Sequence, residues 1–268
     1  MSKPTLSVHF AKLKEAELVA VERQGTSLIY HLNLSILEEA LTGLPRFQGT
    51  RRMIRDVVLT RINLLLLALL AAVTANAFVA VPADAILPVH WGPDGQADRF
   101  AGRNEAFLMM PVIVLAMCGL FAAIVRYMPR EQVEGGKYGL GVIISALLVL
   151  FLTIQSGLLL TGLGMPVAMV QLIMLGMALL LIVTGNVLPK SQPNRFAGIR
   201  LPWTLADHAN WRATHRLVGM LMMAGGFLLA ILALLPIHPL VLFAGFLLAV
   251  LVPLIVGGIY SYQLSRRA

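Results

Sequence analysis

Charged residues and cysteine are both scarce in this chain of 268 residues. Only 13% of the residues are charged, about half the share usual in soluble proteins, while 58% are apolar and the mean hydropathy is +0.82. The single cysteine, Cys118, excludes a disulfide framework. The composition therefore argues against a soluble enzyme or a disordered tail and indicates an integral membrane protein.

Four stretches lack charged residues altogether: 62–83, 106–125, 138–189 and 217–265. A helix needs about 20 apolar residues to cross the hydrocarbon, so the first two stretches predict one span each. The other two are long enough to cross twice, and glycine and proline interrupt them at 162–166 and 236–239. Continuous apolar runs favour helices over a barrel. We expect an all-α integral membrane protein with a six-helix transmembrane bundle.

Lysine and arginine gather on one side of these spans. Of the 21, 19 precede the first span, follow the last, or lie in the second or fourth connection; Arg99 and Arg103 alone lie in the first. The positive-inside rule then places both termini and the connection 189–216 in the cytoplasm, and the connection 84–105 outside. We therefore expect a multi-pass protein of the bacterial cytoplasmic (inner) membrane. The basic residues before the first span are expected to contact anionic lipid headgroups of the bilayer: Arg51, Arg52, Arg55 and Arg61.

Residues 1–45 differ in character from the rest of the chain. Ser2, Lys3 and Pro4 can begin a helix that places Leu6, Phe10 and Leu13 on one face. Two β-prone runs, 19–23 and 26–32, flank Gln24-Gly25 and predict a hairpin. Ser35 can then cap a second helix over 36–41. Residues 46–61 form a basic linker to the first span.

This helix-hairpin-helix segment resembles the second half of a winged helix-turn-helix of the ArsR repressor type. The resemblance depends on residues 2–10, Leu13, 15–19 and 23–30. It implies that the helix over 5–9 enters the major groove, with the polar side chains toward DNA. The DNA-facing residues would be Ser2, Thr5, Ser7 and His9. Two interpretations stay open: a partial module that no longer binds DNA by itself, or a start codon placed too late.

The outward connection 84–105 is rich in glycine, proline and aspartate, which predicts tight turns. His90, Asp94 and Asp98 could together bind a cation, but their spacing favours a structured turn at the membrane surface over a metal site. The cytoplasmic connection 189–216 combines prolines, tryptophans and cations beside two helix ends. This composition predicts an ordered loop at the membrane interface.

The cytoplasmic connection also contains the patterns N-x-L-P-K, P-N, G-I-R-x-P-W-T-L and W-x-x-T-H-R, and these resemble the SdpI family of membrane immunity proteins. The resemblance covers about residues 62–268, since 88–99 is similar to the family's small N-terminal membrane domain. It implies a two-span domain over 62–127 and a four-span domain over 128–268. The residues expected to dock a partner are Asn186, Pro189, Lys190, Pro193, Asn194, Gly198, Ile199, Arg200, Pro202, Trp203, Thr204, Trp211, Thr214, His215 and Arg216.

The resemblance further implies resistance to a secreted peptide toxin, sensed by an outward loop. The residues expected there are His90, Trp91, Gly95, Asp98 and Arg99. In this family the toxin-engaged immunity protein holds an ArsR-type repressor at the membrane, so we expect such a repressor, or the chain's own N-terminal segment, as partner. Whether the segment still binds DNA stays open.

Two other classes of function are considered. A small-molecule or ion transporter or channel is disfavoured because the spans contain no ionisable carboxylate, lysine or arginine in their interior. A metal-dependent membrane hydrolase would have to use Asp207, His208 and His215, which have no recognised ligand spacing. We therefore expect a binding protein, not an enzyme, without catalytic residues, metal ligands or cofactors.

Overall fold

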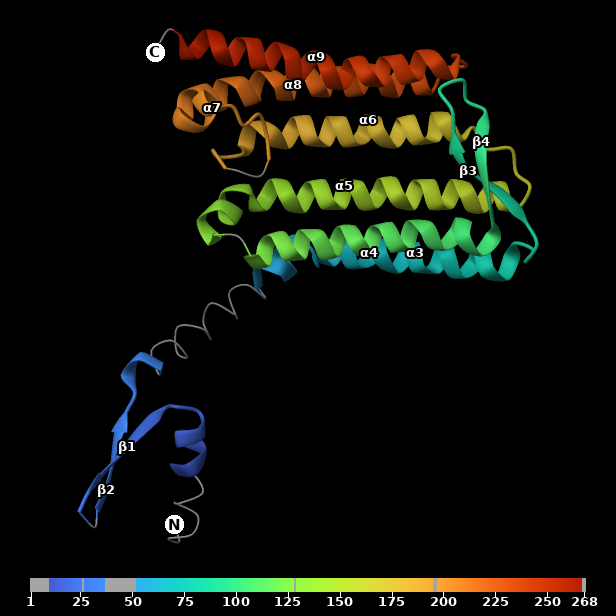
Figure 1. Cartoon of the computed structure of the whole chain (residues 1–268). Helices are drawn as coiled ribbons and strands as arrows, with labels where there is room; N and C mark the ends of the chain where they lie inside the picture. The colour runs from blue at the N-terminus through green and yellow to red at the C-terminus, as the bar shows by residue number, and fades with distance from the viewer. Residues whose placement is uncertain (1–9, 26, 37–51, 128, 195–196, 267–268) are drawn as a thin grey trace. The chain divides into compact units, whose positions relative to one another are not determined.

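The computed structural model describes residues 10–25, 27–36, 52–127, 129–194 and 197–266. The chain divides into two compact units, residues 1–53 and 54–268. The first unit contains a small sheet, and the second contains the long helices (Figure 1). The domain boundaries expected after residues 45, 61 and 127 stay predictions.

The N-terminal unit contains a two-stranded antiparallel hairpin. Strands β1 (Val19–Gln24) and β2 (Ser27–Leu32) pair along their full lengths. Gly25 lies in the turn with a φ of 64°, a left-handed conformation that glycine adopts without steric cost. The predicted hairpin is confirmed.

A short helical stretch precedes this hairpin. Residues 10–15 are helical, and the ring centroid of Phe10 lies 4.4 Å from that of Tyr30 on β2. Part of the apolar face expected on the helix therefore packs against the hairpin. The predicted DNA-facing residues Ser2, Thr5, Ser7 and His9 lie outside the described residues, as does the helix expected over 36–41 beyond residue 36.

The second unit contains six helices that are long and apolar enough to span a membrane, counted over its described residues. They are α3 (Arg61–Ala80), α4 (Arg103–Tyr127), α5 (Arg130–Gly162), α6 (Met169–Val187), α8 (His208–Ala233) and α9 (Pro239–Ser265). The breaks between α5 and α6 and between α8 and α9 fall where glycine and proline predict them. The predicted spans correspond to six helices of membrane-crossing length and apolarity, and the described part of the protein is mostly helical.

Consecutive helices run in opposite directions, and α5 and α6 lie between the pairs α3–α4 and α8–α9 (Figure 1). Helix α3 packs against α4 and α5, α5 against α6, and α6, α8 and α9 against one another. The connections after α3, α5 and α8 therefore lie at one end of the bundle, which we call the hairpin end. The connection after α6 lies at the other end, the loop end.

The connection predicted over 189–216 is too long, because α8 begins inside it. The carboxylate of Asp207 accepts the backbone N–H groups of Ala209 and Asn210 at 2.8 and 3.2 Å, which satisfies two donors of the first helical turn. Residues 208–216 are consequently helical. The charge-free run located the span but not its first turns, where charged residues are tolerated.

The connection predicted over 84–105 as turns contains a second hairpin, so the all-α prediction omitted two strands. Strands β3 (Ile86–Trp91) and β4 (Ala97–Gly102) are antiparallel, with register shifts after Pro88 and His90. Proline lacks the N–H of a regular ladder, and the surrounding glycine and aspartate obscured the strand pattern. Tertiary packing stabilises the strands instead.

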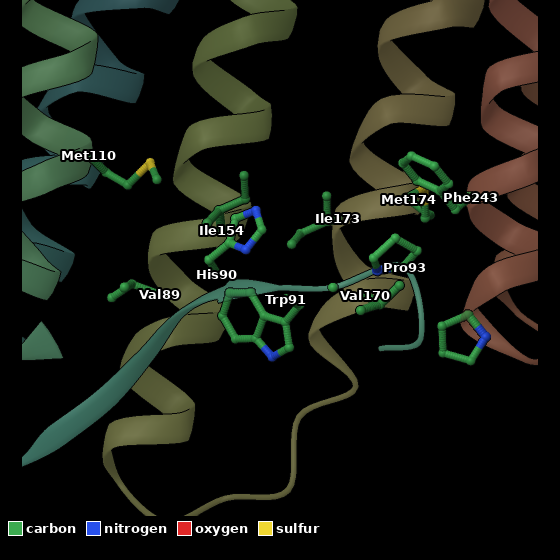
Figure 2. Close-up of a pocket in the computed structure, with 12 residues that line it drawn as sticks. Val89, His90, Trp91, Pro93, Met110, Ile154, Val170, Ile173, Met174 and Phe243 are labelled. Carbon is green, nitrogen blue, oxygen red and sulfur yellow. The ribbon is translucent and has the colours of Figure 1, made fainter. Parts of the chain in front are cut away.

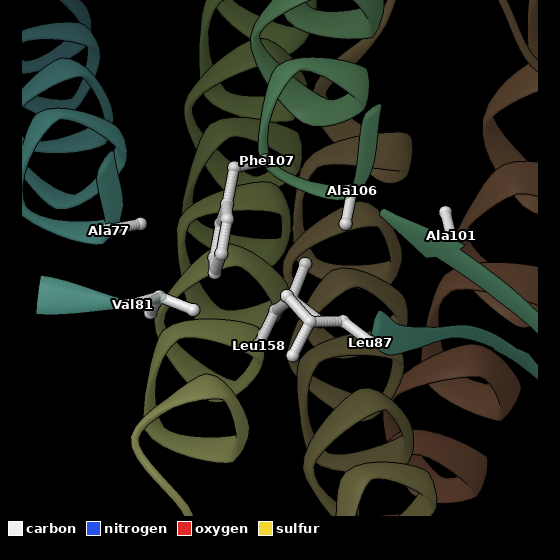
Figure 3. Packing of buried hydrophobic residues seen from close by; sticks show 7 residues of the cluster. All are labelled: Ala77, Val81, Leu87, Ala101, Ala106, Phe107 and Leu158. Carbon is white, nitrogen blue, oxygen red and sulfur yellow. The ribbon is translucent and has the colours of Figure 1, made fainter. Parts of the chain in front are cut away.

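Figure 3 shows this packing as a cluster of buried apolar side chains at the hairpin end. The members come from α3, the hairpin, α4 and α5: Ala77, Val81, Leu87, Ala101, Ala106, Phe107 and Leu158. Leu87 and Ala101 point from the two strands toward the helices. The hairpin is therefore anchored to the bundle by burial of apolar surface.

Polar side chains inside the bundle connect neighbouring helices. Asn63 on α3 accepts the Ser145 hydroxyl of α5 at 2.6 Å. Gln155, fully buried on α5, donates to the Thr74 hydroxyl at 2.9 Å and to the Phe107 carbonyl at 3.0 Å, so it joins α3, α4 and α5. Hydrogen bonds of this kind contribute modestly, on average about 0.6 kcal/mol in a membrane.

Candidate functional site

The loop end contains most of the residues expected to dock a partner. The connection from Leu188 to Asp207, which we call the Pro-Trp loop, contains the 3₁₀ helix η1 (Leu188–Lys190) and the short helix α7 (Pro202–Ala206). Trp211 on α8 lies fully buried beneath it. The indole N–H of Trp211 donates to the Ser191 carbonyl at 3.0 Å, which fixes the first part of the loop.

His215 fixes the second part of the loop. The imidazole is fully buried and stacks on Trp211 with ring centroids 3.9 Å apart. Nδ1 donates to the Trp211 carbonyl at 2.7 Å, and Nε2 accepts the backbone N–H of Ile199 at 3.0 Å. These two contacts together require the neutral imidazole with its proton on Nδ1. His215 therefore binds the loop backbone through both of its ring nitrogens.

Gly198 makes room for the imidazole. Its φ is 102°, and a Cβ at this position would collide with Nε2 of His215. Glycine is therefore needed here for both backbone conformation and space. Thr204, also buried, donates from its hydroxyl to the Ile199 carbonyl at 2.7 Å and accepts the Leu201 N–H at 2.9 Å. The loop is thus an ordered structure, held by buried side chains.

Two residues missed by the sequence reasoning connect this structure to α9. The Nδ2 of Asn210 donates to the Ser261 carbonyl at 2.9 Å, and its Oδ1 accepts the hydroxyls of Ser261 and Thr214 at 2.8 and 3.0 Å. All three side chains are buried. Asn210 directly precedes the W-x-x-T-H-R pattern, but its partner Ser261 is 51 residues away, so nothing in the local sequence indicated the contact.

The expected docking residues therefore fall into three groups. Asn194, Thr204, Trp211, Thr214 and His215 are buried and support the loop, while Pro189, Pro193, Ile199 and Trp203 are partly exposed. The exposed ones are Asn186, Lys190, Gly198, Arg200, Pro202 and Arg216. Only the exposed group offers side chains or backbone for a partner to contact without rearrangement.

Lys190 has local contacts at this surface. Its Nζ lies 3.4 Å from Oδ1 of Asn186 and 5.7 Å from the ring centroid of Tyr138 on α5.

Trp203 packs edge-on against Tyr262 of α9, with ring centroids 5.5 Å apart, and its buried Nε1 has no hydrogen-bond partner among the described residues. Over the same residues, no group of three or more His, Cys, Asp and Glu is placed to bind a metal, so Asp207, His208 and His215 do not form one.

The hairpin end brings together some of the residues expected to sense a toxin. His90 Nδ1 and Asp98 Oδ1 lie 2.6 Å apart, across the two strands. Gly95 at the hairpin tip has a φ of 83° and packs against Pro239 at the start of α9. Arg99 points elsewhere, with Nη2 3.8 Å from the sulfur of Met109. His90, Asp98 and Gly95 thus each have a defined contact at the hairpin, whereas the Arg99 side chain points toward α4.

Arg103 is a further residue at this end that the sequence reasoning did not single out. Its Nη1 donates to the carbonyls of Phe78 and Val81 at 3.3 and 3.0 Å, and its guanidinium carbon lies 5.3 Å from the Phe78 ring centroid. A cation at these carbonyls compensates the exposed C-terminus of α3. Its charge is consequently directed at the helix and away from the hairpin tip.

Comparison with known proteins identifies two segments of the chain. Residues 190–257 match the SdpI/YfhL protein family, and residues 64–115 match a domain of unknown function, DUF1648. The chain is 24% identical over 181 residues to the immunity protein SdpI of Bacillus subtilis (strain 168), covering 68% of this chain and 84% of that protein. No solved structure matches. These findings support a relation to the SdpI family.

Proposed function

We propose that this chain is an immunity protein of the bacterial cytoplasmic membrane, which protects its cell from a secreted peptide toxin by binding and not by turnover. The observation that supports this most is the likeness of residues 190–257 and of the wider chain to a family whose relative is named an immunity protein. The six membrane-length helices agree with a multi-pass protein.

The charge distribution supports an orientation with both termini in the cytoplasm. The Pro-Trp loop and α8 contribute Lys190, Arg200, Arg212 and Arg216 to the loop end, whereas the hairpin end contains Asp84, Asp94, Asp98 and Glu105. By the positive-inside rule the hairpin end then faces outward. In this orientation His90, Trp91, Gly95, Asp98 and Arg99 meet a toxin arriving from outside.

The exposed residues of the Pro-Trp loop form the docking surface for a repressor-like partner. The buried residues Trp211, His215 and Thr204 hold the loop in one conformation. The partner is an ArsR-type repressor or the chain's own N-terminal segment, which contains the β1–β2 hairpin. A covalent connection would give this segment a high effective concentration at the loop without a separate binding event.

Protection of toxin-sensitive bacteria tests this function. Cells that express the full chain are exposed to a secreted peptide toxin, and survival is compared with that of cells carrying an empty vector. Wild type should increase survival, and Arg200→Ala should reduce the increase by at least about tenfold, the effect of losing ~1.4 kcal/mol of binding. Arg212→Ala is the matched control, because Arg212 is an exposed arginine of the same end at a variable position of the W-x-x-T-H-R pattern.

Membrane levels of each variant are measured by immunoblot. Absence of protection by wild type at normal membrane levels would contradict the proposal. An ion-driven uptake of substrate into proteoliposomes would favour a transporter instead.

A further inference from the structure

A cavity of about 440 Å³ lies beneath the β3–β4 hairpin, and its lining includes two of the residues proposed to meet a toxin, His90 and Trp91. Figure 2 shows the side chains around it, with Trp91 on the hairpin and Ile154, Ile173 and Met174 on α5 and α6. Its volume falls within the range of ligand pockets in proteins, about 300–1,000 Å³.

The walls of the cavity come from both matched segments. Trp91 and Met110 belong to the stretch that matches DUF1648, and Phe243 belongs to the stretch that matches the SdpI/YfhL family. The contact of Gly95 with Pro239 closes the hairpin tip onto α9. The cavity is therefore formed between the two matched segments, and neither segment encloses it alone.

The lining selects for an apolar ligand. Ile154, Ile173 and Phe243 contribute branched or aromatic surface, and Met110 and Met174 contribute flexible thioethers that adapt to different shapes. A ligand that fills such a space gains by removing apolar surface from water or from the headgroup region. Leucine and phenylalanine side chains have the chemistry that fits.

Two carboxylates lie at the rim. A Cβ placed on Gly92, which lines the cavity, would lie 2.8 Å from Oδ1 of Asp94 and 3.6 Å from Oδ2 of Asp98. The two arginines of this connection do not neutralise them in the structure, because Arg103 is directed at the α3 carbonyls and Arg99 at Met109. The contact of Asp98 is with Nδ1 of His90, which lies 2.6 Å from its Oδ1. The rim is consequently acidic and complements a cation.

We infer that this cavity binds apolar side chains of a secreted peptide that carries a lysine or arginine next to them. The apolar part occupies the space between Trp91 and α6, and the cation lies at Asp94 and Asp98. The identification of the peptide as secreted rests on the proposed function, whereas the chemistry of the ligand rests on the cavity alone.

Binding of a designed peptide tests the inference. The full chain is placed in phosphatidylcholine nanodiscs and titrated with a dansyl-labelled peptide that contains a leucine-phenylalanine run and a terminal lysine. A second peptide has glutamate in place of the lysine, and empty nanodiscs measure partition into lipid. Fluorescence anisotropy should report that the lysine peptide binds about tenfold more tightly than the glutamate peptide, as expected for complementary charge.

Variants of the lining and the rim separate the two parts of the site. Ile173→Trp should fill the cavity and weaken binding of both peptides by about tenfold or more. Ile154→Trp does the same from α5, in case the first variant folds poorly, and size-exclusion elution checks both. The matched control is Ile255→Trp on the exposed face of α9, which should bind as wild type does.

Asp98→Asn should reduce the preference for lysine to below about threefold, while Asp84→Asn, an exposed acid of the same connection outside the cavity lining, should leave it unchanged. Equal affinity for the two peptides, or binding unaffected by either tryptophan in the cavity, would overturn the inference. If wild type binds in this way but gives cells no toxin resistance, the proposed function fails and the cavity assignment stands. If resistance and peptide binding both persist in Ile173→Trp and Ile154→Trp, the cavity assignment alone fails.

Discussion

At the loop end, a sequence pattern does not distinguish residues that hold the loop in place from residues that contact a partner. His215, Trp211 and Thr204 are all members of the family pattern, yet each is buried and hydrogen-bonded to the backbone of the Pro-Trp loop. Unsatisfied loop N–H and carbonyl groups would cost about 1–3 kcal/mol each if these partners were removed. Their first role is therefore to keep the loop in one conformation.

Gly198→Ala tests this role at the residue scale. The substitution places a Cβ against Nε2 of His215 and forces alanine into a positive φ. The free energy of unfolding should fall by about 1–3 kcal/mol more than in Gly164→Ala, because the hydrogen bond from Ile199 to the imidazole is lost. Gly164 also has a positive φ, 78°, but a Cβ there meets nothing within 4 Å. Unfolding followed by tryptophan fluorescence measures both, and equal losses would contradict the proposed contact.

At the scale of elements, α6 and α8 approach closely because small residues face each other. A Cβ on Gly185 would lie 2.5 Å from the Gly219 carbonyl, and a Cβ on Gly226 would lie 2.9 Å from the Ala178 carbonyl. Such small-residue contacts stabilise helix pairs in membranes through van der Waals packing of the backbones. The glycines thus position α8, and with it Trp211 and the Pro-Trp loop.

Gly219→Ala should separate these two helices. The added methyl group collides with the Gly185 carbonyl and should reduce the free energy of unfolding by about 1–3 kcal/mol, as overpacking does in other cores. Gly258→Ala on α9 is the matched control, because it is also a helical glycine and its Cβ would meet nothing within 4 Å. Unfolding in mixed detergent micelles gives both values. A loss in Gly219→Ala no greater than in the control would rule out a close α6–α8 contact.

At the scale of the second unit, the two candidate surfaces lie at opposite ends of the bundle (Figure 1). Asp94 and the hairpin are at one end, and Lys190 and the Pro-Trp loop are at the other. A protein that senses a ligand on one side of a membrane and binds a partner on the other needs this separation. Helices α6 and α9 extend between the cavity lining at Met174 and Phe243 and the loop end.

Accessibility labelling tests the orientation. In a Cys118→Ser background, which removes the only native cysteine, Asp94→Cys should react with a membrane-impermeant maleimide in intact cells. Lys190→Cys, which replaces an equally exposed charged side chain, should react only after permeabilisation. The reason is the excess of lysine and arginine at the loop end, which the positive-inside rule retains in the cytoplasm. Labelling of Lys190→Cys from outside would reverse the proposed topology.

The sequence by itself determined the six membrane-length helices, the breaks between paired helices and the hairpin of the N-terminal unit. Each of these depends on local chemistry: apolar runs of membrane length, glycine and proline at turns, and β-prone residues beside Gly25. Only the tertiary structure decided that β3 and β4 form strands, that Asn210 and Ser261 meet, and which docking residues are buried. It also decided the cavity, whose lining extends from Val89 to Phe243. The physical reason is that hydrophobic period and turn chemistry act between neighbours in the chain, whereas these features arise from packing between helices that the chain brings together only when folded.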